Sequence, residues 1–500
     1  MNSLLIATPP MILCGGSVLV LLMGLWIKSH KALLISTVLT LAATAAFYLN
    51  FASKESQSAF AGMLVHDPLG NFFSIFSVFV TAIVVLVSAR SSEIKKDRRS
   101  EYYSILLALA SGLIFMSVST HLLLIYLAVE TVSILSYTLA GFNREKGTSV
   151  EASMKYVVYG SAASAIMIYG MSFIYGLTGG LELQQIRSYF EITSPDQVPT
   201  MMWLATLLVF AGIGYKISAA PMHMWTPDVY EGSPTPVSAL LSVAPKAAGF
   251  ALLIRFFVTG FTFPTAVSDI AIAKSGEAFL IAGSLNWPKF LMFSSILTMF
   301  MGNLAALGQS SVKRILAYSS IAHAGYMLMG MTTLTADGIS AIAFYLVIYC
   351  FMNIGAFWVA SKVEDVFGGD QLRHFRGLVY RQPFYAVVMG VFLFSLVGLP
   401  PFAGFIGKLY LFQAIIAKGM YSFAIIAAAN SVISLYYYVK IIKAMFLESP
   451  EVKMPSGKLA FDSRFTMAFL LLLAIPNLIL GLYWEPVIKI ANEAVSIFVR

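Results

Sequence analysis

The sequence predicts an all-α polytopic membrane protein with about fourteen transmembrane helices. Of its 500 residues, 59% are hydrophobic and 11% are charged, whereas roughly 25% of residues are charged in an average soluble protein. Apolar runs of about 18 to 25 residues recur along the whole chain, and each can cross a hydrocarbon core of roughly 30 Å as a helix. The chain is therefore expected to lie in a bilayer.

The predicted spans follow one another with short connections. They lie near 8–27, 32–51, 69–89, 102–119, 121–142, 156–178, 201–222, 236–258, 289–308, 314–333, 338–360, 384–416, 420–445 and 464–484. No basic segment precedes the first run, as it would in a signal peptide, so this run is expected to be a retained helix. The twelfth run would be roughly 50 Å long as a straight helix, which is too long for one perpendicular span. Pro400 and Pro401 interrupt it near its middle.

Basic residues indicate how the helices are oriented. Most of the 32 Lys and Arg residues lie in alternate loops, including 90–99 and 373–381. By the positive-inside rule these loops face the cytoplasm, and both termini face the other side. The formal net charge of +8 therefore reflects topology and requires no nucleic-acid partner. We expect a multi-pass protein of a bacterial inner (plasma) membrane.

The sequence predicts that this chain binds no cofactor and no metal. Cys14 and Cys350 lie far apart in apolar surroundings, so neither an iron–sulfur centre nor a structural disulfide is expected. The fragment GIG at 212–214 lacks the third glycine and the preceding strand of a dinucleotide-binding motif. A nucleotide site is not expected either.

Four ionisable residues lie within predicted spans, where a charged side chain costs several kcal/mol. They are Glu130, Lys216, Lys246 and Lys408. Each lysine could extend its side chain to the headgroups, or Glu130 and a lysine could form a static buried pair. Extension is least plausible for Lys246, about eleven residues into its span. The sequence thus favours functional roles for these groups.

Their chemistry suits proton transfer. Desolvation shifts the pKa of a buried lysine towards neutral pH, and a nearby carboxylate shifts it back by favouring the charged form. Moving Glu130 towards or away from Lys216 would therefore load and release a proton without any cofactor.

Two of the lysines accompany predicted helix breaks. Lys216 is followed by Pro221, which removes a backbone donor, and then by a polar stretch that begins with His223. Lys408 follows the proline pair of the twelfth run. A broken helix at membrane depth persists only where protein or water satisfies the freed backbone groups. These features indicate a hydrated path, with His223 as a further relay candidate.

The spacing of these residues suggests an internal repeat. Lys216 and Lys408 are 192 positions apart, and Glu130 and His323 are 193 apart. Two five-helix units, spans 4–8 and 9–13, would each carry an ionisable group on the second helix and a lysine on the broken fourth. Since five is odd, the second unit must be inverted. His323 titrates near neutral pH and is a relay candidate, but it could equally be a hydrogen-bonded core histidine.

The chain is thus divided into four parts. Residues 1–100 hold the first three helices, 101–260 and 285–446 hold the two repeats, and 460–500 hold the last helix and the tail.

Two long motifs resemble a known family. HMWTPDVYEGSPTPVSALLSVAPKAAGF at 223–250 and KRILAYSSIAHAGYMLMG at 313–330 are similar to segments of the antiporter-like membrane subunits of proton-pumping NADH-quinone oxidoreductase, respiratory complex I. The form PDVYEGSPTP followed by SVAPKAA most resembles subunit N. The resemblance covers essentially the full length of the chain.

The resemblance implies two inverted repeats and proton transfer along a hydrated axis at the membrane midplane. By motif, Glu130 resembles the glutamate of the fifth helix, and Lys216 the pump lysine of the broken seventh. Lys246 resembles the bridging lysine of the eighth helix and Lys408 the terminal lysine of the broken twelfth, while His323 lies at the tenth-helix position. Proton transfer would be driven by quinone reduction in other subunits.

The resemblance also implies partners and cofactors. The partners would be further antiporter-like and small membrane subunits, with quinone involved only indirectly. NADH or another reductant, flavin, iron–sulfur clusters and quinone would be used by the other subunits.

Alternatives from other classes remain open. A cation–proton antiporter would use the same fold, although it would favour an aspartate in the middle of a span, and the aspartates here fall in or near loops. A non-conducting scaffold could pass conformational changes between neighbouring subunits. The four intramembrane charges argue against a scaffold.

Overall fold

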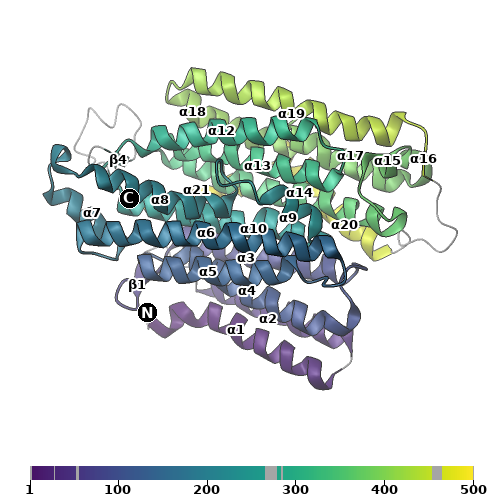
Figure 1. Ribbon diagram of the computed structural model, residues 1–500, viewed down its shortest axis with the longest axis horizontal. Coiled ribbons are helices and arrows are strands. Elements are labelled where there is room, and N and C mark those ends of the chain that lie inside the picture. Colours follow the sequence, from purple (N-terminus) through teal and green to yellow (C-terminus); the bar gives the residue numbers. More distant parts are fainter. Residues whose placement is uncertain are drawn as a thin grey trace.

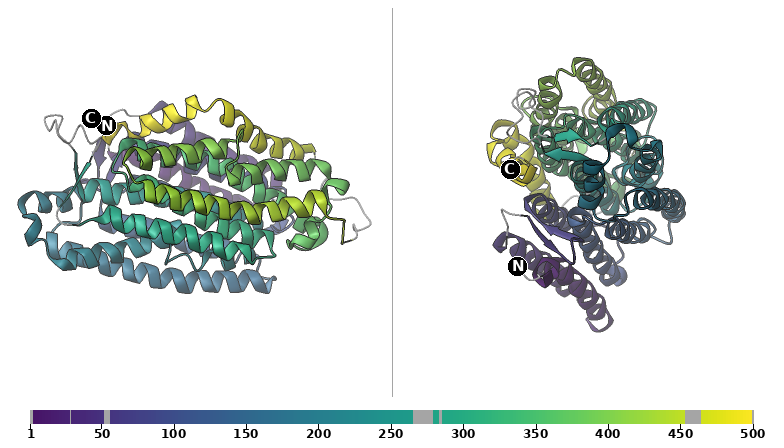
Figure 2. Two further views of the ribbon diagram at one scale, coloured as in Figure 1. Left: turned by 90° about the horizontal axis from the view of Figure 1, so that it is seen from above. Right: turned by 90° about the vertical axis from the view of Figure 1, so that its left-hand side faces the viewer.

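The protein, described here by a computed structural model, is a bundle of long helices that run side by side (Figure 1). The structure describes residues 3–27, 29–51, 56–264, 279–282, 285–452 and 464–498. The two ends of the chain lie at the same end of the bundle (Figure 2), as an even number of crossings requires. We call the other end, where loops 89–95, 141–146 and 368–371 lie, the basic end.

Three helices and a short hairpin open the chain. They are α1 (Ser3–Trp26), α2 (His30–Asn50), the antiparallel strands β1 (Gln57–Ala59) and β2 (Leu64–His66), and α3 (Pro68–Ser88). Asp67 caps α3 by accepting a hydrogen bond of 2.7 Å from the backbone N–H of Gly70. The same carboxylate forms a buried ion pair with Arg255, at the far end of α10, so it joins the first helices to the centre of the bundle.

A first group of helices follows. Its members are η1 (Lys96–Arg98), α4 (Arg99–Val118), α5 (Leu122–Ala140), α6 (Gly147–Thr178), α7 (Leu183–Ile192), η2 (Pro195–Gln197), α8 (Thr200–Ile217), α9 (Thr226–Gly232) and α10 (Thr235–Ile254), which continues as the π-helix η3 (Arg255–Thr259). A second hairpin comes next, with antiparallel strands β3 (Thr262–Pro264) and β4 (Phe279–Ile281).

A second group and a C-terminal pair complete the bundle. The second group comprises α12 (Trp287–Leu307), α13 (Val312–Met331), α14 (Ala336–Phe367), α15 (Leu372–Phe375), α16 (Leu378–Arg381), α17 (Pro383–Val397), α18 (Ala403–Ala417) and α19 (Tyr421–Leu447). The chain then forms α20 (Arg464–Leu482), α21 (Glu485–Val495) and η4 (Ser496–Phe498).

The fold class predicted from the sequence is confirmed. Within the described residues, 12 helices are long and apolar enough to cross a membrane, and they correspond to twelve of the predicted spans. The other two predicted spans correspond to α13 and to the pair of shorter helices α17 and α18. The amphipathic helices α7 and α21 and the two hairpins were not predicted.

Burial differs sharply between the helices. Every residue of α10 is buried, because α3, α4, α8, α13 and α14 all pack around it. In contrast, α1, α2, α19 and α20 lie on the outside of the bundle (Figure 2). They expose many large apolar side chains, as expected of helices that contact lipid. Glu130, Lys216, Lys246 and His323 lie on α10 or on helices that pack against it, whereas Lys408 lies on α18, which packs against α13 and α14.

Candidate functional site

Glu130 and Lys216 lie on neighbouring helices but do not form a direct ion pair. The Nζ of Lys216, which is 1% exposed, donates a hydrogen bond of 2.8 Å to the Oγ of Ser133, one turn from Glu130 on α5. No nitrogen–oxygen contact of 4.0 Å or less joins Glu130 to Lys216, and among the described residues the buried Oε1 of Glu130 has no hydrogen-bond partner. The pair is therefore open, with a serine beside it.

The helix break expected near Pro221 begins earlier. Helix α8 ends at Ile217, because Ser218 adopts the left-handed conformation with φ 62° and ψ 36°. Pro221 and His223 lie inside the break that separates α8 from α9. Lys216 thus occupies the last turn of α8, where the partial negative charge of the helix terminus stabilises a cation.

Lys246 is completely buried in the centre of α10. Its Nζ donates hydrogen bonds to both the carbonyl oxygen, at 2.7 Å, and the Oγ of Ser320 on α13. One turn further along α10, Gly249 packs directly against α8: a Cβ at this position would lie 2.6 Å from Ile217 and 3.8 Å from the Cβ of Lys216. Lys246 is therefore bonded to the second group of helices, while its own helix contacts Lys216.

His323 links three helices through hydrogen bonds. Its Nδ1 lies 2.7 Å from the hydroxyl of Tyr345 on α14, and its Nε2 lies 3.1 Å from the hydroxyl of Tyr438 on α19. The Tyr438 hydroxyl also bonds the Oγ of Ser319. Ser320, which binds Lys246, and Tyr326, whose ring lies beneath the ammonium group of Lys408, are each three residues from His323 on α13. Neighbours of His323 on its own helix therefore contact both lysines.

Lys408 lies just after the second helix break, near the start of α18. Its Nζ donates hydrogen bonds to the carbonyl oxygen of Val397, at 2.7 Å, and to the Oγ of Ser431 on α19, at 3.1 Å. The ammonium group also lies over the ring of Tyr326, 4.9 Å from its centroid. Pro400 and Pro401 lie between α17 and α18. The side chain of Lys408 therefore bridges the break.

Three of these groups lie at nearly the same depth. Glu130 is ten residues from the basic end of α5, and Lys246 and His323 are each eleven residues from the basic ends of their helices. At 1.5 Å per residue these distances are roughly 15 to 16 Å, half of a 30 Å hydrocarbon core. The arrangement is a row of ionisable groups across the middle of the bundle.

The same short sequence precedes both Lys216 and Lys408. The spacing of 192 residues between the two lysines does not by itself reveal it. Phe210-Ala-Gly precedes Lys216 by the same number of residues as Phe402-Ala-Gly precedes Lys408. The helix breaks do not follow this pattern, because the break at α8 comes after Lys216 and the break at α18 comes before Lys408. The two lysines therefore belong to opposite halves of their broken helices.

Sequence reasoning missed the hydroxyl groups that bind the ionisable residues. The signal that could have identified them is helical spacing: Ser133 is three residues after Glu130, and Ser320 is three residues before His323. The tyrosine partners have no such signal, because they come from other helices. Among the described residues, no group of three or more His, Cys, Asp and Glu side chains could hold a metal ion.

Comparisons with known proteins relate this geometry to one family. The family described as "NADH:quinone oxidoreductase/Mrp antiporter, TM" matches the chain twice, over residues 119–283 and 268–434. NADH-quinone oxidoreductase subunit N 2 of Sorangium cellulosum is 42% identical over 99% of this chain and 97% of the relative. NADH-quinone oxidoreductase subunit N of an Anaeromyxobacter species is 38% identical over 98% of this chain and 96% of the relative.

Solved structures agree with these matches. A chain of respiratory complex I from Thermus thermophilus superposes with a TM-score of 0.77 at 31% identity, covering 96% of this chain and 98% of that one. A chain of the Mrp complex from Dietzia superposes with a TM-score of 0.81 over 99% of this chain and 98% of that one, but at 20% identity it shows only a shared fold. The chain belongs to the NADH-quinone oxidoreductase subunit N family.

Proposed function

We propose that this chain carries protons across the membrane, as a membrane subunit of NADH-quinone oxidoreductase, through the row formed by Glu130, Lys216, Lys246, His323 and Lys408. The observation that carries the proposal is that His323 is hydrogen-bonded to hydroxyl groups of α14 and α19, while its helix contacts buried Lys246 through Ser320 and buried Lys408 through Tyr326. Amine and imidazole groups can bind and release protons, and hydroxyl groups between them can pass protons on.

The cycle begins at the open pair. When Glu130 approaches Lys216, the carboxylate stabilises the ammonium form and the lysine takes up a proton. When Glu130 withdraws, desolvation favours the neutral amine and the proton leaves. The hydrogen bond from Lys216 to Ser133 holds the lysine beside α5 in the open state. Quinone reduction in other subunits would supply the change that moves the pair.

The proton then passes from the first group of helices to the second. Lys246 on α10 is hydrogen-bonded to Ser320 on α13, and His323 lies one turn further along α13. Lys408 receives the proton and releases it on the side opposite the basic end. In this proposal the basic end faces the cytoplasm of a bacterial cell and both termini face outwards, as the distribution of Lys and Arg predicts. His223, inside the break after α8, is a further relay candidate.

Electrons would not pass through this chain. NADH or another reductant, flavin, iron–sulfur clusters and quinone would be bound by other subunits of the complex. The chain would act as the translocating part of the enzyme, in contact with further antiporter-like and small membrane subunits. The four-part division, with repeats at 101–260 and 285–446, belongs to the same proposal.

Two buried aspartates argue against a sodium–proton antiporter. A sodium site needs free oxygen ligands, but Asp67 is paired with Arg255, and Asp365 is paired with Lys362 at 2.7 Å. Both carboxylates are therefore already paired with a basic side chain of this protein.

The test is proton translocation per electron pair in proteoliposomes of the whole complex, with quinone reductase activity measured separately in the presence of an uncoupler. Lys216→Ala and Lys408→Ala are expected to lower proton yield while the complex still assembles. Lys443→Ala is the matched control, because this lysine side chain is 63% exposed. Unchanged yield in both buried-lysine variants would leave the chain as a coupling scaffold.

A further inference from the structure

A polar pocket opens at the basic end, between the two groups of helices. Its volume is about 360 Å³, and charged side chains from both groups line it. Lys146 and Glu151 come from the first group, and Lys313, Glu364 and Asp370 come from the second. Water and protons from this side of the membrane can therefore reach the boundary between the groups.

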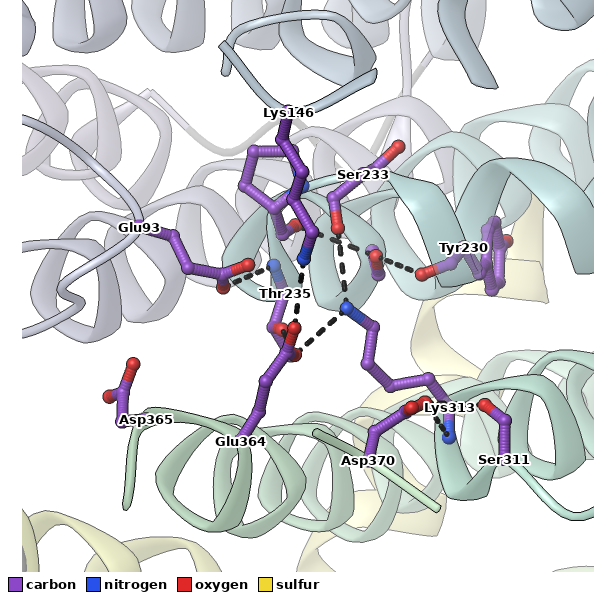
Figure 3. Close-up of polar contacts among 12 residues, drawn as sticks. Glu93, Lys146, Tyr230, Ser233, Thr235, Ser311, Lys313, Glu364, Asp365 and Asp370 are labelled. Atoms are coloured by element: carbon purple, nitrogen blue, oxygen red, sulfur yellow. Dashed lines mark hydrogen bonds and ion pairs between the residues drawn. The ribbon is translucent and has the colours of Figure 1, made fainter. Parts of the chain in front are cut away.

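Two lysines meet one carboxylate at the floor of this pocket (Figure 3). The Oε1 of Glu364 lies 2.9 Å from the Nζ of Lys146, and its Oε2 lies 3.1 Å from the Nζ of Lys313. The hydroxyl of Thr235, at the start of α10, donates a hydrogen bond of 3.3 Å to the same Oε2. The pocket floor is thus in direct contact with the first residue of the helix that carries Lys246.

A line of polar side chains runs from this floor to Lys246. Thr235, Ser238, Ser242 and Lys246 are spaced three, four and four residues apart, so they lie on one face of α10. The line is roughly 16 Å long at 1.5 Å per residue. Hydroxyl groups at every turn are unusual on a helix whose residues are all buried. We call these three hydroxyl residues, together with Asn353, the polar path.

Asn353, on α14, meets this line at Ser242, one turn from Lys246. Its Nδ2 donates a hydrogen bond to the Oγ of Ser242, and the residue is completely buried. Within the described residues, its Oδ1 has no hydrogen-bond partner. A buried amide oxygen is normally paired, with an ordered water where no protein donor reaches it. The free Oδ1 therefore marks a position for water about one helical turn from Lys246, on the side of the basic end.

Tyr230, on α9, adds polar groups beside this face of α10. It accepts a hydrogen bond of 2.7 Å from Ser238 through its carbonyl oxygen, and its own hydroxyl donates to the carbonyl oxygen of Leu241 at 2.9 Å. The same hydroxyl lies close to Ser320, which holds the Nζ of Lys246. Polar groups thus accompany the path along its whole length.

The approach to Lys216 from the same end is different, because aromatic rings fill it. Trp225 stacks on Tyr156 with centroids 4.3 Å apart, and the ring of Tyr137 meets Tyr156 edge-on at 4.7 Å. Tyr215, the neighbour of Lys216, lies 5.2 Å from Trp225 and donates a hydrogen bond to the carbonyl oxygen of Tyr156. Within the described residues this layer consists of large aromatic rings, whereas the corresponding face of α10 carries small hydroxyl side chains.

We propose that protons are taken up along the polar path and first reach the row at Lys246, with Asn353 as the positioning residue for the water that completes the path. The inference rests on the proposed function, which it refines. A proton from bulk water at the basic end moves along the path to the neutral amine of Lys246. Each water or hydroxyl group that gives a proton to the next group accepts another from its neighbour on the side of the basic end. Lys216 is then loaded from Lys246 rather than through the aromatic layer, and its proton returns through Lys246 when Glu130 withdraws.

The experiment compares Asn353→Leu with Asn353→Ser in proteoliposomes of the whole complex. Leucine fills the site without a polar group, whereas serine is polar and leaves room for water. We expect Asn353→Leu to lower the coupled rate of proton translocation about tenfold, and Asn353→Ser to stay within about twofold of the unmodified complex. Ser361→Ala is the control, since this buried α14 serine is not part of the path.

Tyr137→Phe tests the competing route through the aromatic layer. It is expected to leave the rate unchanged. Loss of translocation in Tyr137→Phe with a normal rate in Asn353→Leu would overturn the inference and place uptake at Lys216. Normal translocation in Asn353→Leu would overturn it as well, yet the proposed function would stand as long as Lys216→Ala and Lys408→Ala lower the proton yield.

A second measurement does not depend on the assembly of Asn353→Leu. Ser242→Cys is expected to react with a small, water-soluble, membrane-impermeant thiol reagent added on the side of the basic end, because the path is hydrated. Ser136→Cys, next to the aromatic layer on α5, is the matched control and should not react. Equal reactivity of the two cysteines, or none at Ser242→Cys, would contradict a hydrated path.

Discussion

The ammonium group of Lys408 lies 2.7 Å from the carbonyl oxygen of Val397, the last residue of the helix before the break. This contact satisfies a backbone acceptor that the interrupted helix leaves without an intrahelical partner. The lysine therefore has a structural role, in closing the break, as well as its proposed role in proton release. Substitutions that separate the two roles are more informative than removal of the side chain.

Lys408→Arg is the substitution that separates them. Arginine keeps the positive charge and can donate to the carbonyl oxygen, but it is effectively always protonated. We expect the complex to assemble normally and its coupled proton translocation to fall about 100-fold. Lys443→Arg is the control. Normal translocation in Lys408→Arg would exclude deprotonation of this side chain from the cycle.

Glu130→Gln should impair the loading of Lys216. Glutamine has nearly the same shape but no charge, so it cannot favour the ammonium form of the lysine. The expected result is a loss of about tenfold or more in coupled translocation, with quinone reductase activity retained when an uncoupler is present. Glu191→Gln, on α7 and with a side chain that is 52% exposed, is the control. If both variants behave alike, the open pair has no special role.

Tyr438→Phe tests whether the hydroxyl that joins Ser319 to His323 transfers protons. Removing it interrupts the hydrogen-bonded connection on the Nε2 side of the histidine. Coupled translocation is expected to fall several-fold, measured as the initial rate of acidification or alkalinisation of the vesicle lumen. Tyr436→Phe is the matched control, since Tyr436 lies on the same helix and is 64% exposed. Equal rates in both variants would make His323 a core histidine.

Asp67→Asn should destabilise the subunit without altering the row of ionisable groups. Both residues of the Asp67–Arg255 pair are 2% exposed, and two oxygens of Asp67 bind two nitrogens of Arg255. Breaking a buried pair by removing one charge costs about 3 to 5 kcal/mol. A lower unfolding temperature of the detergent-purified complex should follow. Asp196→Asn, at an exposed position in η2, should not change it.

The double variant in which Asp67→Leu and Arg255→Met are combined provides the second half of this test. It leaves no unpaired charge in the interior, so it should be less destabilised than Asp67→Asn. The opposite order would mean that the pair has a role other than charge compensation.

Glu93 predicts a pH dependence of stability. This residue lies in the loop between α3 and η1, and burial raises the pKa of its carboxyl group above the ordinary value of 4.5, although Lys313 acts in the opposite direction. Because the folded state holds a proton that the unfolded state has released, stability falls as pH rises from 4.5 through the folded pKa. Glu93→Gln removes this loss and can still accept the hydrogen bond from Thr235.

The measurement is the unfolding temperature of the complex across this pH range. The advantage of Glu93→Gln over the unmodified protein should be small near pH 4.5 and grow as the pH increases. An advantage that shrinks with increasing pH would show that the charged form of Glu93 stabilises the fold.

Sequence alone could predict the spans and the ionisable residues, because both depend on local composition. A lysine such as Lys246 is conspicuous in an apolar run, and the position of a proline pair predicts where a helix is interrupted. The start of the break after α8 was less predictable. It depends on the left-handed conformation of Ser218, which the later Pro221 does not disclose.

The hydrogen-bond partners could not be predicted, for a physical reason. Which hydroxyl group meets His323 is decided by how α13, α14 and α19 pack against one another, and similar tyrosines such as Tyr436 face outwards. Tyr345 and Tyr438 gain their importance only from that packing. The polar face of α10 could be predicted in part. The spacing of its hydroxyl residues can be read from the sequence, but their burial depends on how the neighbouring helices pack.

The central position of α10 has a consequence for the influence of the lipids. A change in bilayer thickness or lipid composition acts on the helices that touch lipid, such as α1, α2, α19 and α20. Lys246 is shielded from such changes by complete layers of protein, whereas Lys408 bonds to α19, which lies at the lipid boundary. Lipid should therefore alter the release of protons at Lys408 while leaving the geometry around Lys246 as it is.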